Sequence, residues 1–422
     1  MARSQAALIA ALCFLFSNAQ TIAPSSDPTE RARRIHRSSI VLDAHIDTTL
    51  RLARGDWDIK EEHPPMPPGI ESRPESQSQS GHVDLPRLRR GGLGALFFGV
   101  VVRDAAYEPG AGPVTGPPAV SAALVQIAAV HKLAADLPDA FALCVTAEDV
   151  RQARRQNRIG ALIGLEGGHM INNSLPILRI YARLGARYMT LTHFYNTDWA
   201  DSSGDRPRHN GLSEFGREVV REMNRLGMLV DISHVSDKAF WDTREVSRAP
   251  LIASHSSSRA IAGHVRNMSD DMIRALASGG GVMAINYHVS YLDQARADHA
   301  SRAQPLLRAL VEKYPGEANE ARRQEELARQ LGQPPAVKWT RIVDHIDHVV
   351  KLVGPDHVAL GSDFDGALMP EGMEDVSQLP KITEELVRRG YSDADIQKIL
   401  GENLLRVMTD AERVAVRMRS TP

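Results

Sequence analysis

Cysteine is scarce in this 422-residue chain, which contains only two cysteine residues. Cys13 lies in an apolar run near the N-terminus that we expect to be removed, so Cys144 would remain as the single thiol. A single thiol excludes an intramolecular disulfide, even in a compartment that permits one. Cys144 lies in the apolar segment 141–145, and we expect it to pack in the core rather than to react.

Long blocks of one charge are also missing. The formal net charge is -2, which argues against a nucleic acid as the main partner. The apolar run Ala6–Phe16 is too short to cross a bilayer. Arg3 precedes this run and Ser17–Ala19 follows it, which is the layout of a secretory signal peptide; an uncleaved N-terminal anchor is the alternative.

These features predict a secreted or periplasmic protein. We expect residues 1–20 to be a signal peptide, 21–35 a polar leader, and 36–416 a single folded domain. The C-terminal residues 417–422 are polar and carry no lipid-anchor signal, so we expect no stable membrane anchor.

A G-x-G-x-x-G motif is absent after the first expected strand, which weighs against a doubly wound nucleotide-binding sheet. About eight short apolar strands instead alternate with helical segments. This alternation predicts parallel strands, and eight of them favour an α/β fold of the (β/α)8 TIM-barrel type. A charged, helix-forming stretch at 300–331 is expected to be an insertion before the last strand. The expected strands are 39–48, 93–102, 161–168, 188–193, 228–234, 250–255, 281–286 and 358–365.

Polar residues with metal-binding side chains end several of these strands. His45 and Asp47 would share one face of the first strand, since strand side chains alternate. Functional groups of such barrels collect at the C-terminal ends of the strands. Each residue alone could be an ordinary core or loop residue, but the repetition favours a metal centre. The later strand-end residues are Glu166, His193, His234, His255 and Asp363.

The number of potential ligands indicates two metal ions. One catalytic zinc binds about three protein ligands and a water, whereas His45, Asp47, Glu166, His234 and His255 together offer three imidazoles and two carboxylates. Two metals sharing a bridging group suit such a set better, and Glu166 could bridge through its two oxygens. We therefore predict two Zn²⁺ ions per chain, held by His45, Asp47, Glu166, His234 and His255.

At these residues the chain resembles the membrane (renal) dipeptidase family of amidohydrolase-type barrels. The matching segments run in family order from about residue 35 to 412, and together they are highly specific. The resemblance implies two zinc ions and hydrolysis of dipeptides to free amino acids by attack of a metal-bound hydroxide on the peptide carbonyl. The segments are Asp43-Ala-His-Ile-Asp47, Gly164-Leu-Glu-Gly-Gly168, Leu191-Thr-His193 with Asn196 and Trp199-Ala-Asp201, Asp231-Ile-Ser-His234, Ser254-His-Ser256, Val265-Arg-Asn267 and Gly361-Ser-Asp-Phe-Asp-Gly366.

The resemblance also implies a role for each residue. His45 and Asp47 would hold one zinc, His234 and His255 the other, and Glu166 would bridge them. Four further residues would act on the substrate: His193 on its carbonyl or oxyanion, Arg266 on its carboxylate, Tyr291 by contact, and Asp363 on the protons.

Two of these roles also follow from side-chain chemistry, although each has an alternative. A guanidinium can bind a free carboxylate through two hydrogen bonds, but Arg266 could also be a surface helix-cap residue. Asp363 could orient a ligand histidine instead of moving protons. We expect Asp43 to support the first ligands and Asp365 to be structural.

Other functions remain compatible with these residues. An N-acyl amino-acid deacylase or a lactam hydrolase would need the same site, whereas a non-catalytic metal-binding barrel would need neither Asp363 nor His193. The chain departs from mammalian family members by having Thr48-Thr-Leu50 in place of a nearby bulky aromatic residue, and by lacking signals for a lipid anchor and disulfides. The side-chain and L/D preference of the dipeptide and the oligomeric state, a homodimer included, are left open.

Overall fold

The computed structural model describes residues 28–66, 80–102, 114–316 and 319–420. The expected signal peptide and residues 21–27 of the expected leader lie outside these ranges. Residues 28–35 of that leader belong instead to α1 (Pro28–Ser38), in which Ala32 and Ile35 are buried. Arg31 of α1 donates to Asp393 Oδ1 at 2.8 Å, so the folded part begins earlier than the residue 36 that we predicted.

Eight parallel strands form a closed barrel, as predicted. β1 pairs with β2 on one side and with β9 on the other, and the pairing of β2 with β4 completes the ring. The ninth strand, β3, was not predicted and pairs with the first half of β4. The strands are β1 (Val41–Ile46), β2 (Leu93–Val101), β3 (Phe141–Leu143), β4 (Ile159–Glu166), β5 (Ala186–Thr190), β6 (Leu229–Asp231), β7 (Ile252–Ser256), β8 (Val282–Ile285) and β9 (Val358–Leu360).

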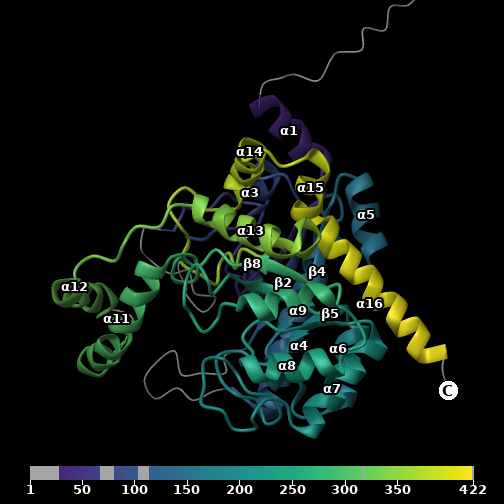
Figure 1. The fold of residues 1–422 in the computed structure, drawn as a ribbon, viewed down its shortest axis with the longest axis horizontal. Coiled ribbons are helices and arrows are strands. Elements are labelled where there is room, and N and C mark those ends of the chain that lie inside the picture. Colours follow the sequence, from purple (N-terminus) through teal and green to yellow (C-terminus); the bar gives the residue numbers. More distant parts are fainter. Residues whose placement is uncertain (1–27, 67–79, 103–113, 317–318, 421–422) are drawn as a thin grey trace, which may run out of the picture.

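Helices surround this barrel (Figure 1). Serine side chains cap several of them: Ser213, Ser236 and Ser269 each accept a hydrogen bond from a backbone N–H of the first turn. The remaining α-helices are α2 (Thr49–Arg54), α3 (Leu85–Arg90), α4 (Gly116–Asp136), α5 (Ala147–Arg155), α6 (Leu175–Arg183), α7 (Glu214–Leu226), α8 (Asp237–Val246), α9 (Asp270–Ser278), α10 (Val289–Leu292), α11 (Gln294–Lys313), α12 (Glu320–Leu331), α13 (Thr340–Val353), α14 (Pro380–Arg388), α15 (Asp393–Gln397) and α16 (Asn403–Ser420). Shorter helical turns are η1 (Gly168–Ile171), η3 (Pro355–His357), η4 (Val376–Gln378) and η5 (Lys398–Glu402).

The core lies on both faces of the barrel strands. β2 and β4 are buried along their whole length, because one face meets the barrel interior and the other meets the helices. Continuous apolar sequence is therefore what these positions require. Cys144 packs in this core as predicted, and burial raises the pKa of its thiol to about 12.

Two helices outside the regular alternation confirm the expected insertion. α11 and α12 lie between β8 and β9 and stand to one side of the barrel (Figure 1). They contact each other through a small cluster of Ala303, Leu310 and Leu327. The insertion therefore has its own apolar contacts, separate from the main core.

Helix α4 is the most apolar of the long helices. Within the described ranges it alone has the length and composition that could also suit a membrane span, and about a third of its apolar window is buried. It contacts α2, η1 and β3 as part of the layer around the barrel. These contacts account for the apolar residues on its inner face.

Candidate metal centre

The predicted ligands meet at the C-terminal end of the barrel. His45 lies in β1, Glu166 ends β4 and His255 lies in β7, while Asp47 and His234 follow β1 and β6. All five side chains are buried. His193 and Asp363, which follow β5 and β9, join them. Three overlapping groups have potential ligand atoms within 4.8 Å of one another: His45, Glu166 and His255; Glu166, His193 and His234; and His45, Asp47 and Asp363.

Glu166 lies at the middle of this cluster. Its Oε1 is 3.0 Å from His234 Nε2 and 3.1 Å from His255 Nε2. Its Oε2 is 3.4 Å from His45 Nε2, and that nitrogen lies 3.1 Å from Asp47 Oδ1. The two oxygens of one carboxylate thus face two different sets of donors.

Two of these residues have an unusual backbone conformation, which sets the direction of their side chains. His234 and Asp363 have φ angles of 70° and 63°, in the left-handed region that side chains rarely adopt. β6 ends at Asp231, earlier than the residue 234 that we predicted, so His234 lies in a turn. Such conformations are costly and often lie in functional sites.

A hydrogen-bonded chain fixes the orientation of His255. The Ser254 hydroxyl donates to Asp231 Oδ2 at 2.5 Å and lies 2.7 Å from His255 Nδ1. Because the hydroxyl hydrogen is already used, Ser254 Oγ can only accept from Nδ1–H. Neutral His255 then has its lone pair on Nε2, which faces the cluster 2.8 Å from His234 Nε2.

The residues present fit a bound cation. His45 Nε2 and Asp47 Oδ1 are buried and have no hydrogen-bond partner in the described part of the chain. Unpaired buried polar atoms are costly, and these two lie 3.1 Å apart. Imidazole nitrogens and carboxylate oxygens are ligands that zinc accepts, and a divalent cation would satisfy both atoms.

The crowding of carboxylates supports the same conclusion. Burial, together with the charge of Glu166, raises the pKa of Asp47 to about 6. Burial, together with the charge of Asp47, raises the pKa of Asp363 to about 7. Glu166 behaves differently: burial opposes its ionisation, but His45 and His193 hold its pKa well below the ordinary value. A bound cation would favour the ionised form of all three carboxylates.

Arg266 is buried beside this cluster and is not a surface residue. Its Nη2 donates to the carbonyl oxygen of His255 at 3.1 Å, and its guanidinium carbon lies 5.5 Å from the ring centroid of Tyr291. Its Nε and Nη1 are buried without a hydrogen-bond partner among the described residues. Unpaired N–H groups on a guanidinium suit a ligand carboxylate.

Further residues support the ligands, and Asn286 among them was not predicted. Asn286 Nδ2 donates to Asp363 Oδ2 at 2.9 Å; as a polar residue at the end of an expected strand, it could have been found. Asp43, which we expected to support the first ligands, accepts the backbone N–H groups of His45 and Ser362 at its Oδ1. Asp365 has structural contacts, accepting from Thr48 Oγ1 at 2.6 Å.

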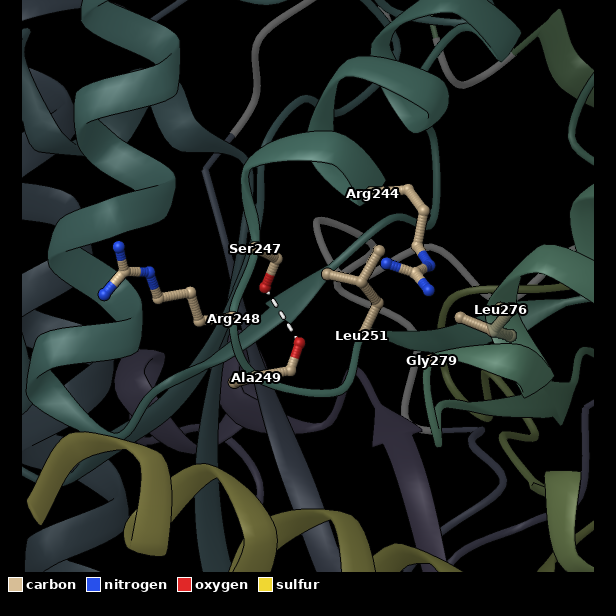
Figure 2. Close-up of a pocket in the computed structure, with 7 residues that line it drawn as sticks. All are labelled: Arg244, Ser247, Arg248, Ala249, Leu251, Leu276 and Gly279. Carbon is tan, nitrogen blue, oxygen red and sulfur yellow. Dashed lines mark hydrogen bonds between the residues drawn. The ribbon is translucent and has the colours of Figure 1, made fainter. Parts of the chain in front are cut away.

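A separate cavity of about 230 Å³ lies near the opposite end of the strands (Figure 2). Leu251 and Gly279, just before β7 and β8, are among the residues that line it. Figure 2 shows the side chain of Arg248 pointing away from that of Arg244, so the two charges do not converge. This cavity brings together no catalytic set.

The fold and these donors define a metal-dependent barrel enzyme. The family model described as Membrane dipeptidase (Peptidase family M19) matches residues 29–422. The chain therefore belongs to the membrane dipeptidase family and is a metallopeptidase of the dipeptidase type.

Solved structures agree with this assignment. The probable dipeptidase PvdM of Pseudomonas aeruginosa is 26% identical, with a TM-score of 0.76 over 92% of this chain and 99% of that one. A metallopeptidase called dipeptidase AC is 27% identical, with a TM-score of 0.69 over 88% of this chain and 98% of its own. A metallopeptidase of Rhodobacter sphaeroides, solved with a phosphinate mimic of the dipeptide L-Ala-D-Ala, is 25% identical, with a TM-score of 0.69 over 88% of this chain and 99% of that one.

Proposed function

We propose that this protein is a binuclear zinc dipeptidase that hydrolyses dipeptides to free amino acids. The observation that carries the proposal is the position of Glu166, whose Oε1 lies near His234 and His255 while its Oε2 lies near His45. His45 and Asp47 would hold one ion, His234 and His255 the other, and Glu166 both. Zinc ions held there would lower the pKa of a bound water and polarise the scissile carbonyl.

Arg266 would select the substrate by its free carboxylate. Its buried, unpaired N–H groups lie next to His255 through the hydrogen bond to that residue's carbonyl. A carboxylate held there is close to the metal ligands, so the bond that reacts must be near the C-terminus of the peptide. Tyr291 would line this subsite, since its ring faces the guanidinium.

Asp363 would move protons during the reaction. The amide of Asn286 donates to its Oδ2, which orients the carboxylate, and its other oxygen can face the reacting atoms. A carboxylate oriented in this way can accept a proton from water and later donate it to the leaving amine.

His193 would stabilise the oxyanion that develops on the scissile carbonyl. Its Nε2 is 3.7 Å from Glu166 Oε1, which puts a potential N–H donor beside the ligands. The same proximity supports an alternative role as an additional ligand, because His193 groups with Glu166 and His234. Metal content of His193→Ala separates the two roles: an oxyanion donor is dispensable for metal binding, whereas a ligand is not.

A substrate panel tests the proposed activity. Zinc-reconstituted protein should cleave L-Ala-L-Ala or L-Ala-D-Ala, which are the first choices because one relative binds a mimic of the latter. N-acetyl-alanine of either configuration has the same carboxylate but no free amine, and should be a poor substrate. Faster cleavage of the N-acetyl compounds would identify a deacylase instead.

We also propose that the protein is exported. The support is the sequence of residues 1–20, with one early arginine, an apolar run and small residues at its end. Mass spectrometry of the mature N-terminus after expression in a bacterial host should show cleavage near residue 20. An intact Met1 on exported protein would contradict a cleaved signal.

A further inference from the structure

Tyr188 contacts the metal centre from the barrel interior. Its hydroxyl oxygen is 2.6 Å from His45 Nδ1, while Nε2 of the same ring faces Asp47 and Glu166. We infer that Tyr188 is a positioning residue: its hydroxyl holds the ring of His45 in the orientation that points Nε2 toward the position of the metal. This inference rests on the proposed role of His45 as a ligand.

Packing from two neighbouring strands holds the tyrosine ring in place. Tyr188 belongs to β5, and its ring passes Gly164 of β4 so closely that a Cβ on Gly164 would lie 2.0 Å from Cζ of the tyrosine. Phe97 of β2 packs on the ring with 4.9 Å between the centroids. Since Tyr188 is fully buried, these contacts, rather than solvent, determine where its hydroxyl lies.

Metal binding selects one arrangement of the hydrogen between Tyr188 and His45. A neutral imidazole has one N–H group and one lone pair. If Nδ1–H donates to the tyrosine oxygen, the lone pair is on Nε2 and can bind a metal. The reverse arrangement puts the proton on Nε2 and blocks binding. Contacts of this kind, which orient a ligand histidine from outside, typically change metal affinity 10- to 100-fold.

The second half of the centre has its own contact of the same kind. His255 is oriented by Ser254 and Asp231, and neither residue hydrogen-bonds to His45 or Tyr188 in the described structure. The two contacts can therefore be removed one at a time. Tyr188→Phe removes the hydroxyl on the His45 side, and Ser254→Ala removes the hydroxyl on the His255 side.

Tyr181 offers a matched control. It is also a fully buried tyrosine, and its hydroxyl donates to the carbonyl oxygen of Met170 at 2.9 Å. Tyr181→Phe therefore removes the same chemical group from the interior without touching a proposed ligand. Any loss of zinc affinity that comes from general loosening of the fold should appear in both tyrosine variants.

The experiment is a zinc titration of metal-free protein against a chelating indicator, which gives the affinity of each ion. Wild type and Tyr181→Phe should bind two ions with the same affinities. Tyr188→Phe should bind one of the two about 10- to 100-fold more weakly and leave the other unchanged. Ser254→Ala should weaken one ion in the same way, and the double variant should weaken both.

The outcomes separate this inference from the proposed function. Two ions bound by Tyr188→Phe as tightly as by wild type would overturn the role of Tyr188. Equal weakening in Tyr181→Phe would also overturn it, since the effect would then be structural. Fewer than two ions on wild type would instead overturn the binuclear proposal. If Tyr188→Phe does not fold, NMR spectra of zinc-loaded wild type decide: a His45 Nδ1–H resonance shifted downfield by a hydrogen bond supports the inference, and a resonance without that shift contradicts it.

Discussion

The backbone N–H of Asp363 donates to the carbonyl oxygen of His45 at 3.0 Å, which ties the end of the last barrel strand to the end of the first. The N–H of Asp47 donates to the carbonyl oxygen of Phe364 at 2.8 Å and completes the connection. Closure of the barrel thereby places the carboxylate of Asp363 within 4.8 Å of potential ligand atoms of His45 and Asp47. The proposed proton transfer by Asp363 therefore depends on how the two ends of the barrel meet.

Asp363→Asn should lower kcat while leaving metal in place. The amide keeps the shape of the side chain and can no longer accept a proton, so we expect kcat to fall about 10²- to 10⁴-fold, the usual contribution of general acid–base catalysis. Zinc content and kcat are measured on the same samples. If Asp363→Asn binds both ions and keeps the wild-type kcat, another group must transfer the proton, and His193 would be the next candidate.

Asp365→Asn is the matched control for that variant. Asp365 is two residues away and buried, but it accepts hydrogen bonds from Thr48 and from the backbone of His82. The change should lower thermal stability and leave kcat of the folded enzyme nearly normal. If Asp365→Asn lost as much kcat as Asp363→Asn, the loss would come from disturbing the segment 363–365 rather than from removing the Asp363 carboxylate.

Glu166→Gln should lose metal and activity together. A neutral amide cannot bridge two cations as a carboxylate does. The loss of metal affinity should therefore exceed the 10- to 100-fold loss that follows removal of a residue hydrogen-bonded to a ligand. Zinc content and kcat are the readouts. Glu222→Gln removes another buried carboxylate, one paired with Arg179 on the outer helices, and should change neither zinc content nor kcat.

Arg266 should make the enzyme depend on a free substrate carboxylate. Amidation of a dipeptide's C-terminus should lower kcat/KM of wild type roughly 10- to 100-fold, because a hydrogen bond to a charged group is worth about 1.5–3 kcal/mol. Arg266→Ala should barely distinguish the acid from the amide. Arg274→Ala, which removes an arginine paired with Asp271, should keep the wild-type ratio. Equal cleavage of acid and amide by wild type would assign Arg266 another role.

The positions of the ligands could be predicted because they depend on local sequence. Side chains alternate along a strand, and parallel strands end on one side, so His45, Asp47 and Glu166 follow from the apolar runs before them. Their supporting contacts could not be predicted in this way. Tyr188 meets His45 across β2 and β4, and no spacing along the chain reports such a contact.

Strand ends were the weaker part of the prediction for a related reason. Ile232, the residue after β6, is apolar, but the hydrogen-bonded strand already ends at Asp231. His234 then has a left-handed backbone conformation. The sequence shows which residues are apolar, whereas the turn depends on contacts made by the loop. Among these, the N–H of Ser203 donates to the carbonyl oxygen of His234 at 2.7 Å.

His345 should make the stability of the protein fall in weak acid. Its Nδ1 accepts the backbone N–H of Ser258 and its Nε2 donates to the carbonyl of Leu292, and burial lowers its pKa to about 4. Between pH 6.5 and 4 the unfolded chain therefore binds more protons than the folded one. The free energy of unfolding should consequently decrease as the pH is lowered from 6.5 to 4. One residue can account for roughly 3 kcal/mol.

Urea unfolding of metal-free protein at several pH values checks this expectation. His345→Gln retains an amide that can accept and donate hydrogen bonds but cannot be protonated in this range. Its unfolding free energy should depend less on pH between 6.5 and 4 than that of wild type. Identical slopes for the two proteins would show that His345 does not contribute.

Zinc stoichiometry tests the central claim most directly. Purified wild-type protein is stripped of metal, reconstituted with zinc, freed of excess metal and analysed for its elements alongside protein concentration. The position of Glu166 between two sets of donors predicts two zinc ions per chain, with dipeptidase activity returning as they bind. Protein that is folded and retains no stoichiometric zinc after reconstitution would contradict the account.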